Sequence, residues 1–164
     1  MNTECHRIAD QLASNIDGEA WYGNSLREIV EKITAKQAQA RPIANAHSIW
    51  EIVHHLDAWV KFALGAIKGA PIPKWPGMPK EQDWPPVVAN SEDSWQRAVN
   101  SLFSNYRELV KQIKAATDER LDATVPGRTY NFYHLFQSTM QHAVYHSGQI
   151  AMLKKMTSDN TSLG

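Results

Sequence analysis

Several features that mark secreted, membrane-bound or nucleic-acid-binding proteins are missing from this chain of 164 residues. Cys5 is the sole cysteine, which excludes an intrachain disulfide or a cysteine-built zinc site and favours a reducing compartment. Basic and acidic residues both number 17, so no net charge attracts nucleic acid or anionic lipid. No stretch approaches the roughly 20 apolar residues that span a bilayer, and MNTECHRIAD at the start lacks the apolar core of a signal peptide. We therefore expect a cytoplasmic protein with no nucleic-acid or membrane partner.

Strand-like alternation with turn signals is also absent over any useful length, whereas helical periodicity is clear. Apolar residues recur at three- and four-residue steps over residues 47–67, 91–116 and 131–156, which predicts three long amphipathic helices. Gly69 and Pro71 would end the first helix, and Asn90 or Ser91 would cap the second. The length fits a single domain over residues 1–164 with one hydrophobic core.

The N-terminal third is less regular. Residues 4–16 predict a further helix, residues 17–24 contain two glycines, and residues 25–36 resume helical periodicity. We interpret this part as a broken pair, which adds an extra short N-terminal helical segment to four main helices. The predicted fold is all-α, a four-helix bundle.

A long loop between the second and third main helices contains six of the eight prolines and reads PIPKWPGMPKEQDWPPVV over residues 71–88. So many prolines predict neither helix nor sheet. Long loops often cover functional sites, but a surface segment whose Trp75 and Trp84 pack on the bundle would also explain the composition.

Two histidines carry the first sign of chemistry. His142 and His146 are four residues apart, so their rings leave one side of the last helix about one turn apart. The pair continues a row formed by Leu135, Thr139, Ile150 and Leu153, which places both rings inside the bundle. Interior imidazoles need partners, and either a shared metal ion or hydrogen bonds within the core would supply them.

A third ligand would have to come from another helix, where His47, His54 and His55 are the candidates. At about 100° per residue, His54 falls on the polar side of the helix and is expected to face water or to lie behind the ligands. His55 falls at the edge of the apolar stripe and is the better ligand. His47 is expected to cap or pack at the helix start.

Three imidazoles around a divalent ion leave a coordination position open, as in catalytic rather than structural metal sites. A water or thiol bound there would ionise near neutral pH. All-nitrogen ligation suits zinc, nickel, iron or cobalt, and the sequence does not choose among them. The side chains considered for orienting the imidazoles are Asp57, Gln141, Tyr145 and Gln149.

The chain resembles the DinB-like (DinB/YfiT) superfamily of metal-dependent four-helix-bundle proteins over most of its length. The most specific segments are HSIWEIVHHLDAW at 47–59 and QHAVYHSGQIAML at 141–153, supported by EAWYGNSLREIV, the WPP of the loop and Val125-Pro126-Gly127. The resemblance implies a histidine triad of His55, His142 and His146 as metal ligands, and a homodimer. Several relatives are transferases or isomerases that use a low-molecular-weight thiol, which implies such a thiol as a possible cofactor here.

Three hypotheses about function follow. The first is a metal-dependent hydrolase or thiol-dependent transferase that acts on a small molecule of unknown identity. The second is a non-catalytic, stress-related module in which the metal stabilises the bundle or senses a ligand. The third is a helical dimerisation domain with hydrogen-bonded core histidines and no metal. Arg41, Arg107 and Arg128 are the arginines considered for gripping the carboxylates of a thiol cofactor.

Overall fold

A computed structural model describes residues 3–71 and 78–158 of the chain. These residues form helices and two isolated β-bridges, with no named strand among them. The long helices are α1 (Thr3–Asp17), α4 (Ile49–Ile67), α6 (Glu92–Ala115) and α8 (Phe132–Thr157). The short ones are α2 (Leu26–Val30), α3 (Ala35–Gln39), α5 (Lys80–Asp83) and α7 (Glu119–Asp122). The predicted all-α class is confirmed. Within the same ranges, no helix is long and apolar enough to cross a membrane.

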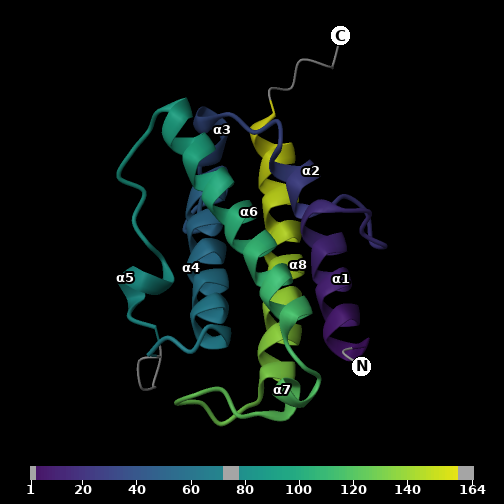
Figure 1. Cartoon of the computed structure of the whole chain (residues 1–164). Helices are drawn as coiled ribbons and strands as arrows, with labels where there is room; N and C mark the ends of the chain where they lie inside the picture. The colour runs from purple at the N-terminus through teal and green to yellow at the C-terminus, as the bar shows by residue number, and fades with distance from the viewer. Residues whose placement is uncertain (1–2, 72–77, 159–164) are drawn as a thin grey trace.

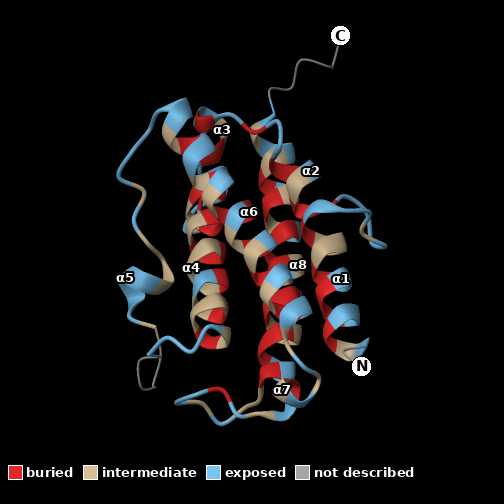
Figure 2. Ribbon diagram, viewed as in Figure 1, coloured by how far each residue is buried: buried red, intermediate tan, exposed pale blue. Residues whose placement is uncertain are grey.

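The four long helices lie side by side as a bundle (Figure 1). Both α1 and α4 pack against α6 and α8, so each of these two pairs occupies opposite corners. Buried residues line the inward faces of all four helices, while the outer faces are exposed (Figure 2). The largest fully buried side chains include Trp50 on α4 and Trp95 on α6, whose rings lie 5.4 Å apart. The buried residues of these helices form one hydrophobic core cluster within the described ranges.

Helix starts follow the capping residues in the sequence. The side chains of Ser48, Ser91 and Asn131 accept hydrogen bonds from backbone N–H groups in the first turns of α4, α6 and α8. The long helices begin and end within two residues of the predicted limits. The predicted limits therefore place each histidine of α4 and α8 on the correct turn of its helix.

The prediction of continuous helical structure over residues 25–36 was wrong. Capping boxes at Ser25 and Thr34 start two separate helices, α2 and α3, with a turn between them. Tertiary bonds occupy the backbone in and beside this turn: the Trp95 indole donates to the Ile33 carbonyl at 2.6 Å, and the Ala35 N–H donates to the Glu92 carboxylate at 2.7 Å. These partners replace the hydrogen bonds of a continuous helix.

The connection from α4 to α6 is long for a topological reason. Both helices run in the same direction, so the chain must return along the bundle from the end of α4 to the start of α6 (Figure 1). The 19 residues of α4 make a helix about 28 Å long, and the return segment has to cover this distance. We call residues 78–91, the described part of this return, the crossover segment; Trp75 lies outside the described residues. The segment contains one helical turn, α5, so the prediction of no helix over 71–88 was wrong there.

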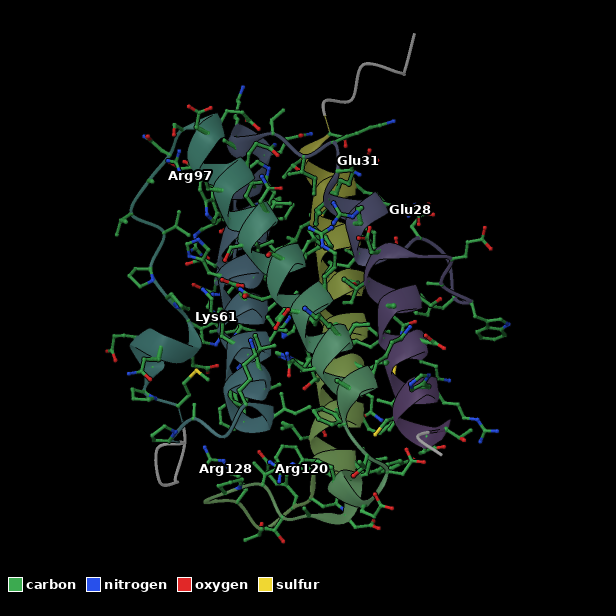
Figure 3. All side chains as sticks on the ribbon, viewed as in Figure 1. Glu28, Glu31, Lys61, Arg97, Arg120 and Arg128 are labelled. Carbon is green, nitrogen blue, oxygen red and sulfur yellow. The ribbon has the colours of Figure 1, made fainter. Side chains whose placement is uncertain are left out.

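The segment that leads from α7 into α8 closes the end of the bundle opposite the starts of α4 and α6 (Figure 1). Arg120 and Arg128 lie at this end (Figure 3). Their guanidinium carbons sit over the rings of Phe132 and Phe62, at 4.3 and 5.1 Å from the ring centres. These contacts fix the entry into α8, the helix that carries two of the site histidines.

Candidate metal centre

Three histidine rings meet where α4 packs against α8. His55 comes from α4, and His142 and His146 come from successive turns of α8. One nitrogen from each ring lies within 4.8 Å of the other two. The Nε2 atoms of His55 and His142 are 2.9 Å apart. His55 and His146 are buried and His142 is half-buried, so the group faces the interior with one partly open side.

The tautomer of His55 is set by the crossover segment. Its Nδ1–H donates to the backbone carbonyl of Asp83 at 2.7 Å, and the Asp83 carboxylate Oδ1 lies 3.1 Å from the same nitrogen. The Trp59 indole donates to that carboxylate oxygen at 2.7 Å and holds it in place. With the proton on Nδ1, the lone pair of His55 is on Nε2, which points at the other two rings.

His146 is oriented in the same way by its own helix. The Gln149 amide donates to the Tyr145 hydroxyl at 3.1 Å, which leaves its oxygen to accept a hydrogen bond from His146 Nδ1–H at 2.7 Å. The lone pair of His146 is therefore also on Nε2. Two of the side chains considered for this role, Tyr145 and Gln149, occupy it.

Burial keeps the three imidazoles neutral. Loss of hydration, together with a smaller contribution from repulsion by positive charge on His146 or His55, lowers the pKa of His142 to about 3. Burial likewise lowers the pKa of His146 to about 4 and lowers that of His55. Near pH 7 all three rings are neutral, which is the form that binds a metal.

The donor set and its spacing fit a divalent metal ion. Two imidazole nitrogens on an ion with bonds near 2.0–2.1 Å are about 3.0–3.4 Å apart, close to the separation of the His55 and His142 Nε2 atoms. Within residues 3–71 and 78–158, this is the one group of three or more His, Cys, Asp or Glu side chains placed to hold an ion. The expectation that these three histidines come together is therefore met by the structure.

The crossover segment also supplies an aromatic clamp. The Trp84 ring stacks on His55 with ring centres 3.9 Å apart, and on His47 at 3.6 Å, with planes within 7° of parallel in both pairs. Trp84 thus lies between the two imidazoles. Together with Asp83 it restricts the rotation of His55, so this part of the loop does more than cover the bundle.

Two cavities border the triad. The first, of about 340 Å³, is lined by His55 and His142 and by residues of the crossover segment and of α8. The second, of about 770 Å³, lies on the side of His146 and is lined mainly by apolar side chains, including Ile52, Met152 and Leu153. A small molecule in the first cavity would contact the rings of His55 and His142, whose Nε2 atoms lie 2.9 Å apart.

The predictions for two other residues of α4, His54 and Asp57, differ from the structure. His54 was expected on a solvated face, but it is half-buried, and its Nε2 accepts a hydrogen bond from the Trp50 indole at 3.0 Å. Angular position on one helix cannot show whether another segment covers that face. Here the crossover segment lies beside His54, and burial lowers the pKa of its ring. Asp57 does not reach the triad, because Ser101, Asn105 and Lys61 take its carboxylate.

Further residues lie away from the three rings. Gln141 is exposed. Arg41 donates to the Ala46 carbonyl and the Glu51 carboxylate, and Arg107 donates to Asp17. Among the described residues that line the two cavities at the triad, none is an arginine. The structure therefore gives no support to an arginine grip on a thiol cofactor.

The fold and the site thus define a helical-bundle protein with a candidate metal centre, formed by neutral histidines from two adjacent long helices. The family model described as the DinB superfamily matches residues 20–150, a range that includes all three histidines. The chain belongs to the DinB superfamily. No curated protein and no solved structure is significantly similar to it.

Proposed function

We propose that this protein binds one divalent metal ion through the Nε2 atoms of His55, His142 and His146. The observation that carries the proposal is the convergence of three neutral imidazoles, two of them with the Nδ1 proton held by a named acceptor. Buried histidines that served only as packing would not need two independent devices that direct their lone pairs to one point.

We further propose that the protein is an enzyme, a metal-dependent hydrolase or a thiol-dependent transferase. A divalent ion at this site would lower the pKa of a water or thiol and so supply a nucleophile near pH 7. The chain contributes the rest: Asp83 and Gln149 hold the ring tautomers, and Trp84 restricts the His55 ring. The half-buried His142 and the 340 Å³ cavity leave room for a small molecule beside the ligands.

We also propose that the chain is one domain over residues 1–164, that it is cytoplasmic, and that it forms a homodimer. Exposed apolar residues support association, because Tyr145, Met152 and Met156 are 64%, 59% and 50% exposed on one helix. Analytical ultracentrifugation at increasing protein concentration tests this part, and a monomer at all concentrations would refute it.

Activity is best tested by removing the metal and restoring it. The protein is stripped with a chelator, reloaded separately with zinc, nickel and iron, and assayed for hydrolysis of p-nitrophenyl acetate and for consumption of glutathione with 1-chloro-2,4-dinitrobenzene. We expect at least one metal to restore turnover, His142→Ala to abolish it, and the control His54→Ala to retain it.

Two results would count against the enzyme. Turnover that persists without metal refutes the metal-activated nucleophile. A large rise in melting temperature on metal binding, with no turnover of either probe, favours a non-catalytic binding module, because a ligand of the folded state stabilises it without any chemistry.

A further inference from the structure

The cavity of about 340 Å³ beside His55 and His142 has a composition that restricts what it can bind. Its walls include two aromatic rings, Trp59 and Tyr130, and the aliphatic side chain of Leu135. These side chains come from three places, α4, the segment before α8, and α8 itself. An aromatic or branched apolar group would find van der Waals contact on several sides.

One wall of this cavity carries a carboxylate. Asp83 is the sole acidic residue among the described lining residues, and no lysine or arginine is among them. Its side chain remains 29% exposed although its Oδ1 accepts the Trp59 indole N–H. The indole bond fixes the carboxylate against the cavity wall, so the negative charge has a defined position.

We infer that this cavity binds a small organic amine, with its ammonium group at the Asp83 carboxylate and its apolar body against Trp59 and Tyr130. Aromatic faces attract cations as well as apolar groups, so both parts of the wall favour the same ligand. An anionic ligand of the same shape would meet the carboxylate and bind more weakly. The inference names the substrate class for the enzyme proposed above and in that sense rests on the proposed function.

The other cavity provides the contrast. Its described lining contains no acidic residue, although it borders His146 of the same triad. Selection of a ligand by its charge is therefore a property of the smaller cavity. A small molecule bound there would lie beside His55 and His142, and so beside the proposed metal. An amine held there would have its apolar body next to the rings of His55 and His142.

Three molecules of nearly equal shape and different charge test the inference: benzylamine, benzyl alcohol and benzoate. Their binding to the metal-free protein is measured at pH 7 by isothermal titration calorimetry. We expect benzylamine to bind about fivefold more tightly than benzyl alcohol, in line with a partly exposed ion pair, and benzoate to bind most weakly. Raising the salt concentration should reduce the advantage of benzylamine.

The decisive variant is Asp83→Asn, which keeps an oxygen for the Trp59 indole and the backbone carbonyl for His55 while it removes the charge. We expect it to bind benzylamine and benzyl alcohol within about twofold of each other, because the ion pair is lost. Glu81→Gln is the matched control: Glu81 is exposed on the same helical turn and is not among the lining residues of the cavity. It should leave the preference unchanged.

Several results would overturn the inference: no detectable binding of benzylamine, equal or tighter binding of benzoate, or an equal loss of preference in the Glu81→Gln control. These measurements use protein without metal, so a failure of the metal proposal does not affect them. Conversely, a protein that retains metal but shows no amine preference would refute this inference alone.

Discussion

The helices that carry the triad and the crossover segment that covers it contribute to the site in different ways. Helices α4 and α8 place His55, His142 and His146 by regular geometry, and each histidine has a buried neighbour in the chain, namely Leu56, Ala143 and Ser147. The crossover segment has no buried residue in α5, and only partly buried residues such as Trp84 and Val87 pack against the core, yet Asp83 and Trp84 fix the His55 ring.

The difference separates placement from orientation. A helix fixes where a ligand side chain starts, but the ring of a histidine can still rotate and exchange its proton between two nitrogens. A hydrogen bond to Nδ1 and a stacked ring remove that freedom. We therefore expect changes in the helix core to damage the fold, and changes in the crossover segment to damage metal binding with little effect on the fold.

The largest effect on stability is expected from Leu56→Ala. Leu56 follows His55 on α4 and is fully buried, so its loss leaves a cavity in the core. The free energy of unfolding, measured by urea denaturation, should fall by about 2–5 kcal/mol. Under native conditions the variant should still retain metal. A fall below about 1 kcal/mol would show that this part of α4 does not hold the bundle together.

Acid should destabilise the metal-free protein through the same region. His142 and His146 have an ordinary pKa of 6.5 when unfolded, but burial lowers it to about 3 and about 4 in the folded chain. The unfolded state therefore binds more protons below pH 6.5, and stability falls as the pH drops toward 4, by about 1 kcal/mol per pH unit for each ring.

Urea denaturation at pH 7, 6 and 5 in the presence of a chelator measures this loss. The double variant His142→Asn/His146→Asn should show a shallower dependence on pH, whereas His134→Asn, at an exposed position of the same helix, should follow the wild type. An unchanged slope in the double variant would mean that other groups control the acid response.

Trp84→Ala tests the crossover segment directly. Removal of the ring that stacks on His55 should weaken zinc affinity by about 10- to 100-fold, as for other contacts that orient metal ligands. The melting temperature of the metal-free protein should change far less than with Leu56→Ala. Val88→Ala, at a 92% exposed position of the same segment, is the control and should bind zinc as the wild type does. Equal affinities for Trp84→Ala and Val88→Ala would contradict the role given to the stack.

A smaller effect is expected from Gln149→Ala, which removes the acceptor for His146 Nδ1. Water can replace the lost bond in part, because Gln149 is only half-buried, so zinc affinity should fall about tenfold. Competition with a chromophoric chelator measures the change, with Gln141→Ala on the exposed side of α8 as the matched control. A loss of the same size in the control would show that the helix surface, and not the hydrogen bond, is responsible.

Residues on helices were the part that the sequence predicted well. The apolar row of α8 and the angular separation of His54 from His55 placed the triad, because an amphipathic helix with a known capping residue has little freedom left. The break between α2 and α3 was missed, although the S-x-x-E and T-x-x-Q capping boxes at Ser25 and Thr34 are visible in the sequence.

The orienting contacts from the crossover segment could not be predicted. Asp83 acts through its backbone carbonyl as well as its side chain, and a backbone group carries no sequence signal. The stack of Trp84 on His47 and His55 depends on the path of a segment that has no periodicity. The same path brings the Pro85 backbone to His54, which is why the expected solvent exposure of that residue was wrong.

The metal content of purified protein tests the central claim most directly. The wild type, His55→Ala and His54→Ala are each exposed to zinc, nickel and iron, freed of loosely bound ions, and examined by elemental analysis. The proposal predicts about one ion per chain in the wild type and in His54→Ala, and almost none in His55→Ala, because three ligands define the site. A wild type that retains no stoichiometric metal, or a greater loss in His54→Ala than in His55→Ala, would contradict it.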